Sequence, residues 1–207
     1  DSSFTFDVTV NGDDVIEGAN ETFFVNLTNV VGADVGDAQG LGTITEDDFP
    51  ILGIHEIQGN GRNSPRTGEF LYTRGIVTAV RTAGYYLQTP DAEADADPLT
   101  SQGIYVFTSN NNVPAQAVVG NLLEVSGTVV EYTPSASPHQ QPLTELTGTT
   151  VTTLVSSGNA LPAAVEITAA LADPAGPVDN LERLEGMRVS IARLVASGPG
   201  EGFIDEN

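Results

Sequence analysis

The sequence predicts an all-β protein in which a small closed barrel follows part of a β-sandwich, with only short helices. Short runs rich in Val, Thr, Ile and Tyr alternate apolar and polar residues, as strands with one face in water do. In a chain of 207 residues, 22 Gly and 12 Pro separate these runs, and helical periodicity is weak. Many short strands with frequent turn residues are typical of sandwiches and barrels.

The first 48 residues predict an incomplete sandwich. Their alternating runs are separated by acidic and Gly-containing turns, and the second run places its apolar residues on one face. Three strands cannot bury two sheet faces, so an isolated unit of this size would be marginally stable. The predicted strands are Phe4–Val10, Glu21–Val30 and Gly40–Thr45.

The remainder predicts a barrel of five or six strands. We expect a linker and entry segment at 49–68, the barrel at 69–200 and a tail at 201–207. Two stretches of about two helical turns are expected, at Ile167–Ala172 and Asp179–Glu185, the second capped by Asp179 and ended by Gly186. The predicted strands are Phe70–Val80, Gly84–Thr89, Gly103–Thr108, Leu122–Tyr132, Leu143–Val155 and Met187–Val195.

Charge is strongly negative and unevenly spread. Seven Arg and no Lys oppose 28 acidic residues, for a formal net charge of −21. Residues 1–50 hold eleven of the acidic residues and no basic one, whereas 51–207 hold the other seventeen and every Arg. Such a field repels a phosphate backbone, so any contact with nucleic acid must be local.

The chain contains no Cys, which excludes disulfides, thiolate metal sites and thiol nucleophiles. No apolar run approaches the length of a membrane span, so no membrane insertion is expected. The first residues are Asp-Ser-Ser-Phe, in the middle of a strand pattern, and we interpret the chain as an internal piece of a longer protein. A secreted or cell-surface bacterial protein is expected.

Three motifs in the first unit resemble the C-terminal half of a Calx-β domain: Val8–Asp13, Glu17–Phe23 and Gly42–Asp48. The resemblance implies an immunoglobulin-like sandwich with a Ca²⁺ site at one end. Ca²⁺ takes six to eight hard oxygen ligands, which carboxylates supply. The alternative is a solvated acidic turn. The ligands implied by the resemblance are Asp13, Asp14, Glu17, Glu21, Asp47 and Asp48.

The second unit resembles the OB-fold region of large secreted bacterial nucleases, which lies upstream of an endonuclease/exonuclease/phosphatase domain in those proteins. The resemblance implies an accessory region, with the nuclease chemistry in a domain beyond residue 207. The segments that carry it are Ile54–Gly59, Gly75–Val80, Gly84–Gln88, Gly103–Phe107, Val125–Val129, Leu143–Leu146, Ser157–Pro162 and Glu185–Met187.

No catalytic centre is expected within the chain. His55 and His139 lie in unrelated contexts, and no nucleophile elbow or phosphate-binding glycine loop occurs. The run Asp91–Asp97 places four carboxylates at alternate positions, but it lacks the sixth-position Gly of an EF-hand loop. A flexible acidic loop is the favoured interpretation, with a calcium role as the alternative.

A nucleic-acid interface is a second possibility for the barrel. OB folds bind single strands by stacking bases on aromatic side chains, with Arg near the backbone. Alternation puts one of two neighbouring tyrosines inward, and the aromatics of the next strand share a face, which could equally be barrel core. Arg62, Arg66, Arg74 and Arg81 form the only basic cluster. The candidate residues are Arg74, Arg81, Tyr85, Tyr86, Tyr105 and Phe107.

Three functions follow as hypotheses. The first is a non-catalytic accessory or scaffold region of a secreted nuclease-like protein, with a calcium-stabilised β-domain. The second is a structural or adhesive subunit of an extracellular assembly or filament, in which a neighbouring domain or chain adds strands to the incomplete sandwich. The third is a single-stranded nucleic-acid-binding OB domain.

Overall fold

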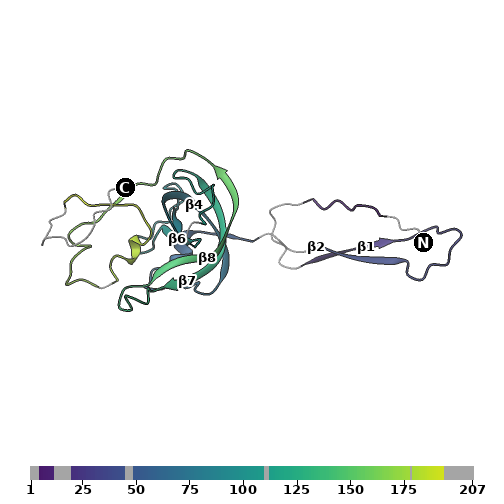
Figure 1. The fold of residues 1–207 in the computed structure, drawn as a ribbon, viewed down its shortest axis with the longest axis horizontal. Helices are drawn as coiled ribbons and strands as arrows, with labels where there is room; N and C mark the ends of the chain where they lie inside the picture. The colour runs from purple at the N-terminus through teal and green to yellow at the C-terminus, as the bar shows by residue number, and fades with distance from the viewer. Residues whose placement is uncertain (1–4, 12–19, 45–48, 110–111, 178, 194–207) are drawn as a thin grey trace. The chain divides into compact units, whose positions relative to one another are not determined.

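The computed structural model describes residues 5–11, 20–44, 49–109, 112–177 and 179–193. The chain divides into two compact units, residues 1–50 and 51–207, which are treated separately below. Figure 1 shows their strands. Among the described residues, every buried hydrophobic side chain belongs to the second unit.

The first unit contains an antiparallel pair of strands, β1 (Glu21–Asn26) and β2 (Gln39–Ile44). The Phe23 ring lies across Gly42, where an added Cβ would come within 2.3 Å of the ring. Phe24 and Leu41 face each other on the opposite side, 58% and 63% exposed. The pair therefore has an apolar surface that no described residue of the unit covers.

The predicted strand at Phe4–Val10 is wrong within the described residues. Residues 5–11 are exposed and lie in no strand, although their apolar and polar residues alternate. Alternation produces a strand only where a second backbone supplies hydrogen bonds. Residues 5–11 form no ladder with another described strand.

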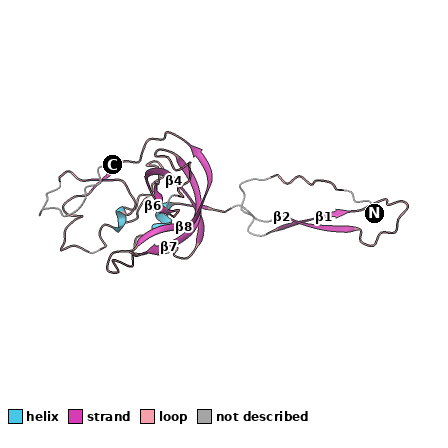
Figure 2. Cartoon of the chain, viewed as in Figure 1, coloured by secondary structure: helices cyan, strands magenta, loops and turns pink. Residues whose placement is uncertain are grey.

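The second unit is a closed five-stranded barrel (Figure 2). Its strands lie in the order β4-β5-β6-β8-β7, and β7 closes the barrel by pairing with β4. All of these pairs are antiparallel except β6 with β8, so the topology is OB-like. The bounds are β4 Phe70–Arg81, β5 Gly84–Gln88, β6 Gly103–Phe107, β7 Leu122–Tyr132 and β8 Leu143–Ser156.

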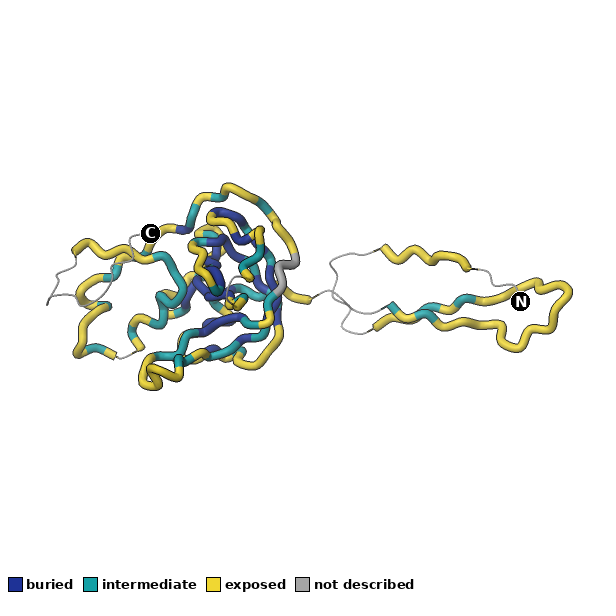
Figure 3. Tube along the Cα trace, viewed as in Figure 1, coloured by how far each residue is buried: buried dark blue, intermediate teal, exposed yellow. Residues whose placement is uncertain are grey.

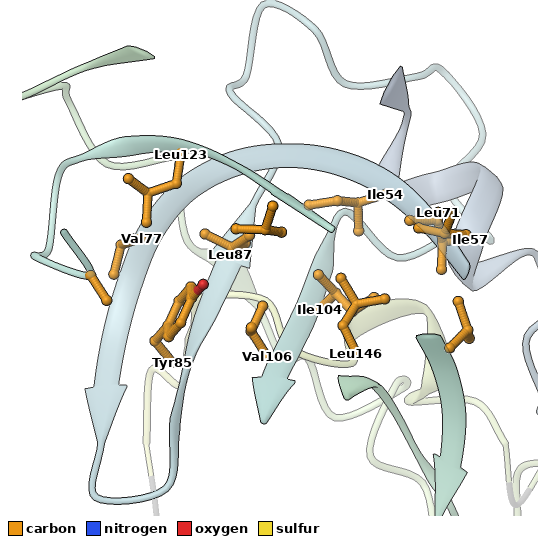
Figure 4. Packing of buried hydrophobic residues seen from close by; sticks show 13 residues of the cluster. Ile54, Ile57, Leu71, Val77, Tyr85, Leu87, Ile104, Val106, Leu123 and Leu146 are labelled. Atoms are coloured by element: carbon orange, nitrogen blue, oxygen red, sulfur yellow. The ribbon is translucent and has the colours of Figure 1, made fainter. Parts of the chain in front are cut away.

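The core fills the barrel with alternate residues of its strands. Tyr85 and Leu87 of β5 and Ile104 and Val106 of β6 are fully buried and point inward (Figure 4). Burying one such side chain is worth about 1.5–3 kcal/mol. Figure 3 shows the buried residues concentrated in this unit.

A short helix, α1 (Ile54–Gln58), precedes the barrel and adds Ile54 and Ile57 to the core. The Glu56 carboxylate accepts a hydrogen bond from the Gly53 amide at 2.8 Å, which stabilises the start of the helix. Just before α1, β3 (Ile51–Leu52) pairs in parallel with β4. Much of the predicted entry segment is therefore built into the second unit.

The last part of the chain contains less regular structure than the sequence predicts. The expected helix at Asp179–Glu185 is one 3₁₀ turn, η1 (Glu182–Leu184), and Ile167–Ala172 forms only turns. Of the expected strand Met187–Val195, residues 187–193 are described, and among them only β10 (Val189–Ser190) is a strand, parallel to β9 (Val165–Glu166). Segments of one or two turns with little buried apolar surface do not sustain an α-helix.

Candidate ligand-binding face of the barrel

Residues predicted for nucleic-acid binding lie on β4, β5 and β6, but not all on one face. Tyr85 points into the barrel and is fully buried, and burial raises its pKa far above the ordinary value of a tyrosine. The prediction that Tyr85 stacks on a nucleic-acid base is therefore wrong, because no ligand on the outer surface reaches its ring. Its neighbour Tyr86 points outward, as alternation requires.

The outer face is built around two paired tyrosines. Tyr86 of β5 lies opposite Tyr105 of β6, with ring centroids 4.9 Å apart. The Tyr105 ring extends over Gly84, where an added Cβ would lie 2.7 Å from its Cζ atom. Tyr105 is consequently only 8% exposed and supports the face rather than presenting a free ring.

The accessible end of the face has one cation and one exposed aromatic ring. Arg81 of β4 and Phe107 of β6 each pair with Gly84 and so flank the same position. Arg81 is exposed, and Phe107 is 37% exposed. Arg81, Tyr86 and Phe107 are called the open face below.

A buried carboxyl group adjoins the open face on β8. Glu145 pairs with Tyr105 and is 5% exposed, and burial raises its pKa to about 7. Burial, together with the nearby Tyr86 and Glu145, raises the pKa of Tyr105, while Arg81 opposes the rise. The positive charge of Arg81 near the open face is therefore partly offset by the neighbouring Glu145.

The predicted basic cluster is dispersed. Arg74 forms an ion pair with Glu93 at 3.1 Å, and Arg66 pairs with Glu69 at 3.4 Å. Arg74 and Arg81 are seven residues apart on β4, about 23 Å of extended strand. Arg74 thus stands apart from the open face, with its charge compensated by Glu93.

The other end of the outer face is covered by the chain itself. Gly103 and Gly186 pack so closely that a Cβ on Gly103 would lie 2.3 Å from the carbonyl carbon of Gly186. The Arg188 amide donates to Gln88 Oε1 at 2.8 Å, and Ser101 Oγ donates to the Glu185 carbonyl at 2.6 Å. Residues 185–188 therefore occupy the start of β6.

Sequence reasoning did not find the half-buried carboxyl cluster of Glu131, Glu182 and Glu185. Glu185 Oε1 accepts hydrogen bonds from the Thr144 amide at 2.7 Å and from Gln58 Nε2 at 3.4 Å. Burial and a hydrogen bond shared with Glu182 raise the pKa of Glu185 to about 8. The Glu185 carboxyl group therefore keeps a proton at neutral pH.

Glu131 completes this cluster from β7. Its Oε1 accepts from the Ser64 amide at 2.6 Å and from Thr144 Oγ1 at 3.1 Å. The pKa of Glu182 is also raised, first by burial, with a nearby Arg62 opposing the rise. These residues come from distant parts of the sequence, so spacing alone offered no sign that they would meet.

The calcium ligands implied by the resemblance lie mostly outside the described residues: Asp13, Asp14, Glu17, Asp47 and Asp48. Glu21 is described; it is exposed and opens β1 opposite Ile44. In the part of the chain that the structure describes, no three His, Asp or Glu side chains form a group suited to a metal ion.

The acidic loop Asp91–Asp97 uses its carboxylates within the protein. Both Asp91 oxygens lie 3.1 Å from the Ala163 amide, and Glu93 pairs with Arg74. Asp95 accepts from Gln102 Nε2 at 2.7 Å, and Asp97 accepts from the Leu99 amide at 2.9 Å. The four groups therefore bond to separate protein donors instead of converging on one point.

Comparisons with family models, curated proteins and solved structures find no match to this chain. The two family resemblances consequently rest on the sequence motifs given above. Among the described residues, no helix is both long and apolar enough to cross a bilayer.

Proposed function

We propose that the barrel is a non-catalytic accessory module of a secreted nuclease-like protein and holds a single nucleic-acid strand on its open face. The supporting observation is the placement of Arg81, Tyr86 and Phe107 on adjacent strands of an OB-like barrel. A base can stack on the Phe107 ring while Arg81 contacts a phosphate. Binding is expected to be weak, because one cation acts within a strongly acidic chain.

The test is titration of a labelled oligothymidylate with the full chain at low salt. Phe107→Ala removes a stacking platform worth about 1–3 kcal/mol, so affinity should fall roughly 5- to 150-fold. Arg81→Ala should weaken binding. It should also reduce the slope of the logarithm of the binding constant against the logarithm of salt concentration, since each phosphate contact contributes about 0.7 to that slope. Arg66→Ala is the matched control, because Arg66 already pairs with Glu69.

No binding at low salt would refute the strand-holding role. Equal losses for Arg66→Ala and Arg81→Ala would refute the assignment to the open face, because they would indicate only a general charge effect. The accessory role has a separate test: a nuclease domain should follow residue 207 in the full-length protein.

The second candidate function, strand complementation in an extracellular assembly, is favoured by the exposed apolar side of the β1–β2 pair. Phe24 and Leu41 present that side without cover from the described residues of the unit. A strand contributed by a neighbouring chain would cover it and satisfy unpaired backbone groups. Because residues 1–50 carry no basic residue, the first units of two chains repel each other. Salt screens this repulsion and should therefore promote association.

Sedimentation velocity over a range of protein and salt concentrations tests this second candidate. We expect association that increases with salt and is lost in the Phe24→Ser/Leu41→Ser double variant. Leu154→Ser, at an exposed apolar residue of the barrel, is the matched control. A strictly monomeric chain at every concentration and salt level would contradict strand complementation between copies.

A further inference from the structure

A cavity of about 490 Å³ opens at the end of the barrel where β6 finishes. This is the opposite end of β6 from Gly103, whose carbonyl contacts Gln58 of α1. Its volume lies within the range of small-molecule sites. The lining residues are Tyr85, Phe107, Thr108, Ser109, Asn112, Val113, Pro114, Gly148 and Thr149.

The lining combines flat apolar walls with neutral hydrogen-bonding groups. Phe107 contributes a partly exposed aromatic ring, Tyr85 lies behind the lining as a fully buried core residue, and Val113 packs against the hydrophobic core. Thr108, Ser109, Asn112 and Thr149 contribute hydroxyl or amide groups that donate and accept hydrogen bonds. None of the described lining residues has a charged side chain.

Two of the lining residues, Tyr85 and Thr108, carry a buried hydroxyl without a partner among the described residues. Thr108 Oγ1 is buried and makes no hydrogen bond among the described residues, although the Thr108 amide donates to the Ala83 carbonyl at 2.9 Å. Buried polar atoms are nearly always satisfied, and an exception requires an explanation. Rotation of the Thr108 side chain toward the adjoining cavity would let a ligand supply the missing partner.

We propose that this cavity binds an uncharged, flat ring compound that both donates and accepts hydrogen bonds. Flatness follows from the exposed Phe107 ring, on which a planar ligand can stack, and hydrogen bonding from the hydroxyl and amide groups. Neutrality follows from the uncharged side chains of the described lining residues, since a charge removed from water without a partner is strongly disfavoured. Phe107 belongs to both the open face and the cavity, so Thr108 and Asn112, which lie outside the open face, separate this proposal from the strand-holding role.

Two probes of this class, benzamide and thymidine, test the site by nuclear magnetic resonance titration of the ¹⁵N-labelled full chain. Both should shift the amide signals of Thr108 and Gly148, with dissociation constants on the order of 1 mM. Benzoate, the charged match of benzamide, should bind at least tenfold more weakly. Benzoate binding as tightly as benzamide, or shifts confined to other regions, would overturn the proposal.

Two substitutions separate ligand binding from folding. Thr108→Val preserves shape and removes a hydroxyl that has no internal partner, so thermal stability should not fall, while thymidine affinity should fall three- to tenfold. Asn112→Ala, at an exposed residue, should produce a loss of similar size. Tyr132→Ala, an exposed aromatic outside the cavity lining, serves as the control. Unchanged affinity in both cavity variants would overturn the assignment.

Discussion

Individual residues on one strand of the barrel have opposite roles because adjacent side chains point to opposite faces. Tyr85 belongs to the core and Tyr86 to the outer surface, although they are neighbours in sequence. Alternation predicts that the two differ, but only the pairing of β5 with both neighbouring strands decides which one is buried. Substitution at these two positions should therefore affect different properties.

Tyr85→Phe is expected to stabilise the protein. The Tyr85 hydroxyl is buried without a hydrogen-bond partner among the described residues, and such a group costs about 1–3 kcal/mol. Its removal should raise the free energy of unfolding by about 1 kcal/mol, measured by urea denaturation. Tyr85→Ala should instead lower it by about 3 kcal/mol through loss of core packing. Destabilisation by Tyr85→Phe would show that the hydroxyl has a partner.

At the scale of elements, a few polar contacts and one carboxyl cluster attach residues 182–190 to the barrel. Glu185 is central, because its side chain bonds β8 through the Thr144 amide while its carbonyl accepts from Ser101. Glu131 and Asp179 raise the pKa of Glu182 further, and Arg62 lowers it. Ionisation of Glu185 beside Glu182 would place two negative charges in a poorly solvated position.

This arrangement predicts a specific pH dependence. The pKa of Glu185 is about 8 in the folded protein and near 4.5 when the chain is unfolded, so the folded state binds more protons between these values. The contribution of Glu185 to stability is fully present below about pH 4.5 and is lost as pH rises to about 8, on the order of a few kcal/mol. Thermal melting across this pH range measures the change.

Glu185→Gln separates this effect from general charge repulsion. The neutral amide reproduces the protonated carboxyl, so the variant should melt above the wild type at pH 8 and match it near pH 4.5. Glu166→Gln, at an exposed carboxylate, is the control for removing one negative charge. Equal pH profiles for wild type and Glu185→Gln would contradict the assignment of the slope to Glu185.

At the scale of the whole molecule, two units of different character share one chain. The described hydrophobic core lies entirely in residues 51–207, whereas residues 1–50 carry eleven acidic residues with no basic residue. Uncompensated carboxylates repel one another and oppose compaction, and a bound cation would relieve this repulsion. The two units should therefore respond differently to calcium.

Calcium binding by a Calx-β-type site should raise the melting temperature of the first unit alone. A ligand that binds only the folded state stabilises it by about 2.7 kcal/mol at one hundred times its dissociation constant. Differential scanning calorimetry should show one transition that moves upward with Ca²⁺ and a second, from the barrel, that does not. Melting that is unaffected by either Ca²⁺ or a chelator would contradict the proposed site. Mg²⁺ at equal concentration controls for simple screening.

Much of the barrel was predictable because strand signals are local. The boundaries predicted for the five barrel strands agree with the observed strands to within one residue at each end. Prediction was poorer where an element depends on distant partners. Residues 5–10 have the alternation of a strand but form no ladder, and only two of the described residues 187–193 are paired in a strand.

The sequence by itself determined the all-β class, the barrel strands and the acidic character, because alternation, turn residues and charge are properties of neighbouring residues. The tertiary structure decided barrel closure, the inward position of Tyr85, the separation of Arg74 from Arg81 and the meeting of Glu185 with Glu182 and Thr144. These features depend on register and on contacts between residues far apart in the chain. Local pattern does not specify such contacts, because the same alternation is compatible with several pairings.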